Sequence, residues 1–272
     1  MKHHLITGAA SGIGLELART LLARGDVVLA CDVNTAPMEQ LRPHAVAPSQ
    51  LQITQLDVRN HEQWESAMQT AARLWPRIDT VMNVAGVMHV DALADIQNSD
   101  VDLHLDVNTK GTIFGTQAAF RVMRNQAPDD RHGRGHIINI ASLAGLAPLP
   151  GLALYCASKF AVRGYSLAVA GELKQHGISL TVICPDAVAT PMTAPLTHKP
   201  AAALVFTGAR LLKIEEVVRA IVDRALVKRP VEIALPRRRA LLAKVAGGWP
   251  AVASLLTDRM TRLGLRHQAK LK

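Results

Sequence analysis

The chain contains 272 residues, of which 49% are hydrophobic and 19% are charged. This balance is typical of a globular protein and excludes intrinsic disorder as the main state. A single α/β domain can have this length and bury most of its unfolded surface. The cysteines Cys31, Cys156 and Cys184 are odd in number and lie in apolar runs, which excludes a disulfide scaffold and favours a reducing, cytoplasmic compartment.

The formal net charge of +9 is concentrated near the C-terminus. Residues 236–272 hold nine of the 31 Lys and Arg side chains and one of the 22 acidic ones, so the preceding residues are almost neutral. The overall charge therefore says little about the main activity. No uncharged apolar stretch reaches the roughly 18 residues that a membrane-spanning helix needs, and we expect no secretory signal at the first residues.

Short apolar runs alternate with longer amphipathic segments along the chain. The runs predict strands at His3–Thr7, Val27–Cys31, Leu51–Leu56, Thr80–Asn83, His136–Ala141, Ser179–Cys184 and Val231–Leu235. The amphipathic segments predict helices at Ile13–Arg24, Glu62–Trp75, Asp100–Asn125 (with Ser99 as N-cap), Tyr155–His176 and Glu215–Val227. Apolar strands that alternate with helices predict an α/β fold with a doubly wound parallel sheet, covered by helices on both faces. We expect residues 1–235 to form one domain and 236–272 to form a basic helical extension.

A glycine-rich turn joins the first predicted strand to the first predicted helix. The segment Thr7–Gly14 has the spacing G-x-x-x-G-x-G. Glycines permit a tight turn and the close approach of a pyrophosphate, to which the free N–H groups at the helix start can donate. We therefore predict dinucleotide binding, with a purely structural turn as the alternative. The predicted contacts are Gly8, Ser11, Gly12, Ile13 and Gly14.

Asp32 follows the second predicted strand, about twenty residues beyond the glycines. A carboxylate at this place can accept hydrogen bonds from both ribose hydroxyls of an adenosine, and it would repel a 2′-phosphate. Neither the glycine turn nor the residues Val33 and Asn34 supply a Lys or Arg. The sequence thus favours NAD(H) over NADP(H); the alternative is that Asp32 caps the next segment.

Tyr155 and Lys159 stand four residues apart on a predicted helix, so they share one face. Ser142 ends a predicted strand shortly before them and can face the same crevice. A tyrosine that exchanges protons near neutrality needs about 4 kcal/mol of phenolate stabilisation, because its ordinary pKa is near 10. The Lys159 ammonium and an adjacent nicotinamide cation are candidates to supply it.

Together these motifs make the chain resemble the short-chain dehydrogenase/reductase family over roughly residues 3–235. The motifs that carry the resemblance are Thr7–Gly14, Asp57-Val58, Asn83-Val-Ala-Gly86, Asn108, Ser142, Tyr155-x-x-x-Lys159 and Pro185 to Thr190. The resemblance implies a seven-stranded Rossmann-like sheet. It also implies a homodimer or homotetramer, formed through the two long predicted helices.

The resemblance also implies a role for each of these residues. Tyr155 would be the general acid/base, Lys159 would lower its pKa and hold the ribose, and Ser142 would bind the substrate oxygen. Asn108 would hold a water in a proton relay behind Lys159. The implied cofactor contacts comprise Asp57 and Val58 at the adenine, Asn83, Ala85 and Gly86 in the crevice, and Pro185, Val188 and Thr190 near the nicotinamide.

Two positions depart from the family pattern. Val84 replaces the second Asn of the usual Asn-Asn-Ala-Gly, and a strand end tolerates it. Asp186 replaces the Gly of the usual Pro-Gly after the sixth strand. Its carboxylate either contacts a polar substrate near the nicotinamide or faces solvent.

The remaining reactive side chains give no further site. The chain has eleven histidines but neither an H-E-x-x-H nor a C-x-x-C motif, so we predict no metal. His3 and His4 would face opposite sides of a strand, and His132 and His136 would flank a glycine loop. Cys156 lacks a neighbouring base and is interpreted as a packed small residue.

The substrate side is expected near Met88, Leu143, Leu149–Leu152 and the apolar segment 191–213. That segment suggests a mobile lid over a pocket for an apolar alcohol or ketone, with ordinary loop packing as the alternative. The basic tail could lie on an anionic membrane surface, cover a partner subunit or pack on the body. Nucleic-acid binding is not expected, because the tail lacks interleaved aromatic residues.

The sequence as a whole predicts an NAD(H)-dependent oxidoreductase that interconverts a secondary alcohol and a ketone, with Tyr155 as the general acid/base. The alternatives are a dinucleotide-sensing regulatory protein without turnover, which the intact Ser142, Tyr155 and Lys159 disfavour, and a membrane-peripheral binding module that uses the tail.

Overall fold

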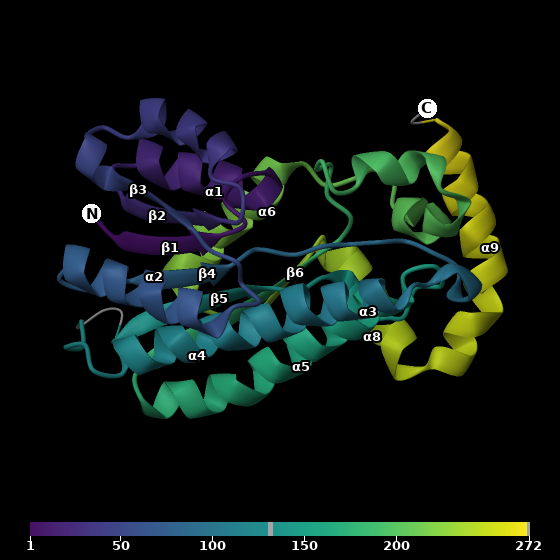
Figure 1. Cartoon of the computed structure of the whole chain (residues 1–272). Coiled ribbons are helices and arrows are strands. Elements are labelled where there is room, and N and C mark those ends of the chain that lie inside the picture. The colour runs from purple at the N-terminus through teal and green to yellow at the C-terminus, as the bar shows by residue number, and fades with distance from the viewer. Residues whose placement is uncertain (130–132, 271–272) are drawn as a thin grey trace.

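The computed structural model describes residues 1–129 and 133–270. Its centre is a parallel seven-stranded sheet in the order β3-β2-β1-β4-β5-β6-β7 (Figure 1). The strands are β1 (His3–Thr7), β2 (Val27–Asp32), β3 (Leu51–Gln55), β4 (Thr80–Asn83), β5 (Gly135–Ile140), β6 (Ile178–Pro185) and β7 (Glu232–Leu235). The predicted α/β class and doubly wound sheet are confirmed.

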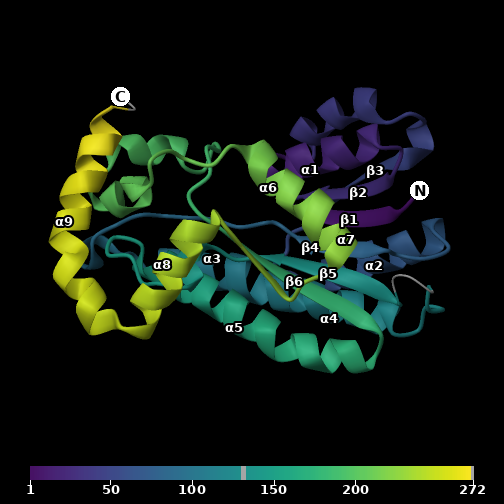
Figure 2. The ribbon, with the colours of Figure 1, turned by 180° about the vertical axis from the view of Figure 1, so that it is seen from behind.

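Helices cover both faces of the sheet, as Figures 1 and 2 show. One face carries α1 (Gly12–Ala23), α6 (Ile214–Ala220) and α7 (Leu226–Lys228), and the other carries α2 (His61–Leu74), α4 (Gly111–Met123) and α5 (Ala153–Gln175). Successive strand residues point to opposite faces, so Leu5 packs with the second group and Ile6 with the first. The central strands β1 and β4 are therefore buried on both faces, whereas the edge strand β3 is partly exposed.

The long helix expected over 100–125 begins earlier and is not regular. It starts at Asn98 after the N-cap Gln97, so the predicted N-cap Ser99 lies inside the helix. Between α3 (Asn98–His104) and α4 lies a π-helical segment, η4 (Leu105–Lys110). Such wider turns are frequent at functional sites, and this one contains Asn108. A second π-helical segment, η8 (Ile221–Ala225), interrupts the helix expected over 215–227.

Residues for which the sequence predicted no element form short 3-10 helices. They are η1 (Ala36–His44), η2 (Pro48–Gln50), η3 (Leu93–Asp95), η5 (Leu143–Gly145), η6 (Ala194–His198) and η7 (Pro200–Thr207). The last two form the segment expected to act as a lid. Its residues Ala202 to Phe206 are buried, so it is a packed part of the structure rather than an open loop.

The C-terminal residues form two helices, α8 (Arg237–Gly248) and α9 (Pro250–Ala269), that make a hairpin at the edge of the molecule away from the N-terminus (Figures 1 and 2). α9 packs on η7 so closely that a Cβ at Gly264 would lie 1.9 Å from the Ala203 carbonyl oxygen. The buried Gln268 amide donates to the carbonyls of Leu196 and Lys199 at 2.7 and 2.8 Å. The hairpin and the lid segment are therefore joined. Among the described helices, none has the length and apolar character needed to cross a bilayer.

Candidate active site

A cavity of about 1180 Å³ opens at the carboxyl ends of the strands, where ligands of doubly wound sheets bind. Nearly all the residues predicted to bind a cofactor or to act in catalysis line it. These are Gly8, Ser11, Gly12, Ile13, Gly14, Asp32, Asp57, Val58, Ala85, Gly86, Ser142, Tyr155, Lys159, Pro185, Val188 and Thr190. The cavity is large enough for a dinucleotide and a substrate side by side.

The glycine turn has the backbone geometry that the sequence pattern predicts. Gly8 and Gly12 have φ values of +68° and +53°, in the region that favours glycine. A Cβ at Gly14 would lie 2.2 Å from the Gly8 carbonyl oxygen, so a side chain there would push the helix off the turn. The start of α1 consequently directs its free N–H groups at the cavity, which suits a pyrophosphate.

Asp32 lies at the end of β2 and lines the cavity, as expected for a ribose-binding carboxylate. Its two oxygens accept hydrogen bonds from the backbone N–H groups of Ala10 and Asn34, each at 3.1 Å. These bonds fix the carboxylate against the glycine turn. Asp32 therefore also caps local backbone. Its position is compatible both with a role as a cap and with binding of a ribose.

Arg59 lines the cavity beside the predicted adenine contacts Asp57 and Val58, and the sequence analysis missed it. Its guanidinium forms a two-pronged ion pair with Asp57, with Nη2 2.6 Å from Oδ2 and Nε 2.9 Å from Oδ1. The pair holds the pKa of the Asp57 carboxyl below its usual range. Because Arg59 follows Asp57 by two residues, the sequence signal was a basic side chain next to the predicted adenine contact.

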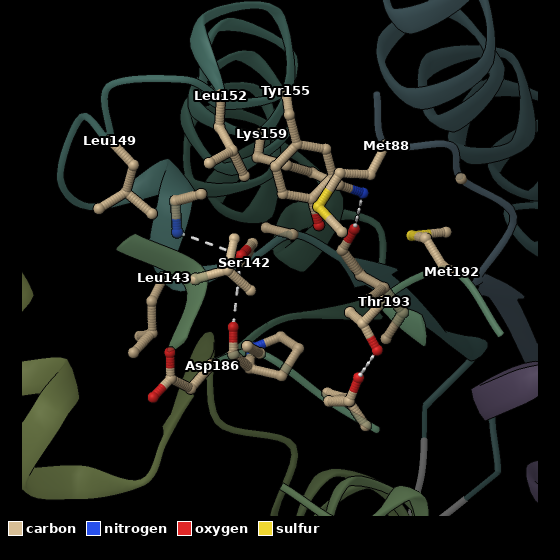
Figure 3. A pocket seen from close by; sticks show the side chains of 18 of the residues that line it. Met88, Ser142, Leu143, Leu149, Leu152, Tyr155, Lys159, Asp186, Met192 and Thr193 are labelled. Atoms are coloured by element: carbon tan, nitrogen blue, oxygen red, sulfur yellow. Dashed lines mark hydrogen bonds between the residues drawn. The ribbon is translucent and has the colours of Figure 1, made fainter. Parts of the chain in front are cut away.

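Ser142, Tyr155 and Lys159 lie on one wall of the cavity (Figure 3). Ser142 follows β5 and accepts a hydrogen bond from the Ala144 N–H at 3.1 Å, which orients its hydroxyl. Lys159 reaches from α5 toward the sheet, and its Nζ donates to the Ile140 carbonyl at 2.9 Å. The same Nζ lies 5.6 Å from the centre of the Tyr155 ring. The structure thus brings the three predicted catalytic residues together.

Burial governs the protonation of both ionisable groups in this triad. It raises the pKa of the Tyr155 phenol to about 12, against a smaller lowering by the Ser142 hydroxyl. It lowers the pKa of the Lys159 ammonium to about 8. Burial is the dominant effect on the Tyr155 pKa in the protein alone, so the lowering expected from Lys159 stays a prediction for the protein with its cofactor. A phenolate near neutrality needs a further positive charge beside the ring.

Two predicted residues lie behind the cavity wall instead of on it. The Asn108 amide is fully buried and bonds to the Val87 backbone in both directions, at 2.8 and 2.9 Å, and donates to the Ser158 hydroxyl at 2.9 Å. Asn83 donates to the Asn139 side chain at 2.8 Å in the interior. Both asparagines thus hold the wall in position, and Asn83 does not line the crevice.

Asp186 lines the cavity, so it does not simply face solvent, and a contact with a polar substrate stays a prediction. Its carboxylate accepts from the Arg239 guanidinium, and the Arg239 Nη2 also donates to the Thr207 hydroxyl at 3.1 Å. The Asp186 side chain is 13% exposed, so it does not face solvent. The carboxylate is already paired with Arg239, so a polar substrate would meet the ion pair and not a lone carboxylate. The pair ties α8 to the end of β6 and to the lid segment.

The far end of the cavity is apolar and has contributions from three segments. The expected residues include Met88, Leu143, Leu149, Leu152, Met192 and Leu204. The tail adds residues that the sequence analysis did not assign to the site, namely Arg239, Leu242, Val245, Trp249, Leu256 and Met260. Successive residues of this set are three, four or seven positions apart in the sequence. This spacing was the sequence signal that they share a helical face. The extension beyond residue 235 is thus a wall of the same site.

The other reactive side chains are structural. All three cysteines are free and buried, and the Cys156 sulfur accepts from the Leu149 N–H at 3.4 Å. His3 and His4 face opposite sides of β1, toward Asp79 and Asp26. In the part of the chain that the structure describes, no three His, Cys, Asp or Glu side chains are grouped to hold a metal. His132 lies outside the described residues.

Comparison with known proteins assigns this site to a family. The model of the short chain dehydrogenase family matches residues 2–201. A cyclopentanol dehydrogenase of Comamonas sp. (strain NCIMB 9872) is 33% identical over 76% of this chain and 81% of its own. An uncharacterized oxidoreductase of Staphylococcus aureus (strain N315) is 33% identical over 70% of this chain and 79% of its own. The chain therefore belongs to the short-chain dehydrogenase/reductase family of oxidoreductases.

Proposed function

We propose that this protein is an NAD(H)-dependent oxidoreductase that interconverts a secondary alcohol and a ketone. The observation that carries the proposal is the shared cavity: Ser142, Tyr155 and Lys159 line the same space as the glycine turn. A nicotinamide held by that turn would accept or deliver the hydride. Family membership makes the reaction class plain, whereas the cofactor preference and the tyrosine mechanism are the proposal.

The residues divide the proton chemistry among them. In oxidation, the Tyr155 oxygen takes the hydroxyl proton of the substrate, and Ser142 donates a hydrogen bond to the substrate oxygen. Lys159 places a positive charge near the ring and a donor near the ribose. In reduction the same groups act in reverse. General acid/base catalysis of this kind is worth about 100-fold to 10,000-fold in rate.

Calorimetric titration with NADH and NADPH at matched salt tests the cofactor part. Tighter binding of NADH supports Asp32 as the group that recognises the ribose. Tighter binding of NADPH contradicts that role and points to Arg59, the basic side chain at the same end of the cavity. Binding of neither nucleotide would overturn the enzymatic proposal.

Turnover of the Tyr155→Phe variant tests the mechanism. We expect it to bind NADH as the wild type does and to lose at least about 100-fold in kcat. A variant that retains the wild-type rate contradicts the role of the phenol. A wild-type protein that binds NADH but turns over no alcohol or ketone would instead support the alternative of a dinucleotide sensor.

We propose an apolar substrate, since leucine, methionine and valine side chains form the far end of the cavity. Cyclopentanol and larger cyclic secondary alcohols are the first compounds to assay, because one relative carries the name cyclopentanol dehydrogenase. A preference for small charged sugars would contradict this part.

The remaining expectations concern partners. We propose a homodimer or homotetramer through the long helices, which sedimentation would test, and a reducing, cytoplasmic location in keeping with three free cysteines. We also propose a peripheral membrane contact through the tail, because α8 and α9 expose many of their apolar side chains.

A further inference from the structure

The turn between α8 and α9 forms an exposed apolar corner. Its side chains Leu241, Leu242, Val245, Trp249, Leu255 and Leu256 are 45% to 82% exposed. These six residues are called the apolar corner. Single exposed apolar residues are ordinary, but a group of them on one hairpin marks a surface that contacts something. Figure 1 shows the hairpin at the edge of the molecule.

Basic side chains surround the apolar corner. Along α9 the buried positions Gly264 and Gln268 face the lid segment. On the opposite side of the helix the exposed residues Leu255, Arg259, Arg262 and Arg266 recur. Arg237 and Arg238 flank the corner on α8. Within residues 1–129 and 133–270, none of these five arginines forms an ion pair with a carboxylate. The outer surface of the hairpin is therefore apolar at its tip and positively charged on both sides.

The same corner is the mouth of the active-site cavity. Leu242, Val245, Trp249 and Leu256 are exposed and also line the cavity. A surface that was covered by a second protein would close this mouth. A lipid bilayer would instead leave the mouth of the cavity accessible to apolar compounds dissolved in the bilayer.

We infer that the α8–α9 hairpin docks on an anionic phospholipid bilayer, with the apolar corner in the headgroup and upper acyl region and the arginines on lipid phosphates. Helices with this division of side chains lie in the interface plane, and tryptophan prefers that depth. The inferred consequence is that the substrate is a lipophilic alcohol or ketone that enters from the bilayer. Docking needs no catalysis, whereas this entry route rests on the proposed function.

The tryptophans of the chain permit a direct test of docking. Trp64 and Trp75 are buried in the core beside α2, whereas Trp249 is 65% exposed at the corner. We would mix the full chain with vesicles of equal parts phosphatidylcholine and phosphatidylglycerol, with brominated acyl chains. We expect a blue shift and quenching of the emission, both absent from the Trp249→Phe variant. Unchanged emission of the wild type would overturn the inference.

A second pair of variants tests which side chains insert. Leu241 and Leu255 are exposed and do not line the cavity, so the double variant Leu241→Ser, Leu255→Ser leaves the active site intact. We expect its vesicle binding to fall by about 10-fold or more, since each leucine loses its apolar transfer energy. Leu74→Ser, at the exposed end of α2, is the matched control and should bind as the wild type does. Equal binding of all three proteins contradicts the inference.

Charge is tested by the triple variant Arg259→Gln, Arg262→Gln, Arg266→Gln. Each basic residue near an anionic surface contributes about five-fold in partitioning, so the triple variant should bind on the order of 100-fold more weakly. Vesicles of phosphatidylcholine alone should bind the wild type poorly. If sedimentation without lipid shows that Leu255→Ser dissociates an oligomer, the corner is an interface between copies of the chain and the lipid assignment is wrong.

The entry route is tested by two alcohols. We would assay cyclododecanol presented in the anionic vesicles and cyclopentanol dissolved in water. The Leu241→Ser, Leu255→Ser variant should lose kcat/KM for the first and keep it for the second. If the double variant no longer binds vesicles but keeps the wild-type kcat/KM for both alcohols, the entry route is contradicted and docking is not. Absence of turnover by every protein, with Trp249 still quenched, contradicts the proposed function and leaves docking standing.

Discussion

Asp186 and Arg239 are 53 residues apart in the chain and form an ion pair between the end of β6 and the first turn of α8. The Arg239 guanidinium also donates to the Thr207 hydroxyl at the end of η7. One side chain thus connects the sheet, the lid segment and the tail. The carboxylate at a position where the family pattern has glycine is matched by an arginine that the tail supplies.

This pair predicts a stability coupling. The Arg239→Met variant leaves the nearly buried Asp186 carboxylate without its partner, and its free energy of unfolding should fall by about 2 kcal/mol in urea titrations. The double variant with Asp186→Asn should cost less than the sum of the single changes. Arg19→Met, in an exposed pair with Glu16, is the control and should change stability by less than about 0.5 kcal/mol. Additive effects at Asp186 and Arg239 would contradict the coupling.

Asp32→Asn is expected to change cofactor preference. The amide keeps an oxygen for the N–H groups of Ala10 or Asn34 but removes the negative charge. The ratio of NADH to NADPH affinity should fall by about 10-fold, because a charge-assisted hydrogen bond is lost and repulsion of a phosphate is relieved. Calorimetry measures both affinities. Arg59→Gln serves as the comparison, and an unchanged ratio in Asp32→Asn would exclude the ribose role.

Lys159→Met should abolish turnover and stabilise the fold at neutral pH. Burial lowers the pKa of Lys159 from 10.5 to about 8, so the folded protein bears a cost for the ammonium. Removal of that cost, offset by the lost bond to the Ile140 carbonyl, should raise the free energy of unfolding by about 2 kcal/mol. Lys174→Met, exposed on the same helix, should change neither quantity.

The lowered pKa of Lys159 makes the free energy of unfolding depend on pH. Between pH 8 and 10.5 the unfolded chain binds the Lys159 proton more strongly than the folded one, so wild-type stability gains from this residue as pH rises through that window. The advantage of Lys159→Met should therefore shrink over it. The raised pKa of Tyr155 acts in the opposite direction above pH 10, because there the folded protein holds the proton that the unfolded chain loses. A difference between the two proteins that is constant with pH would contradict the buried charge.

Gly264→Ala tests the contact between the tail and the lid segment. The added Cβ would meet the Ala203 carbonyl oxygen, so α9 must move away from η7. We expect a loss of about 1 to 3 kcal/mol in unfolding free energy and a raised KM for apolar alcohols. Gly171→Ala, on α5 with open space around it, is the matched control and should gain about 0.5 to 1 kcal/mol. A neutral Gly264→Ala would mean that the tail is loosely held.

The sequence by itself determined the parallel sheet, the glycine-rich turn after β1 and the placing of Tyr155 and Lys159 on one helix. Each depends on spacing within one or two neighbouring elements: apolar runs for buried strands, glycines at a strand-to-helix turn, and a four-residue helical repeat. The bounds of β1 and β4 were predicted to the residue. The same local reasoning located Ser142 at the end of β5.

Only the tertiary structure decided what lies far along the chain from its partner. The ion pair of Asp186 with Arg239, the interior bond of Asn83 with Asn139 and the place of Trp249 at the cavity mouth each join segments that no local pattern relates. The π-helical turn around Asn108 likewise depends on what packs against the helix. The basic and apolar composition of the tail is compatible with packing on a membrane surface, on a partner subunit or on the body of the protein. Its role as a wall of the site follows from the packing of α9 on the lid segment, which joins residues about 60 to 70 positions apart in the chain.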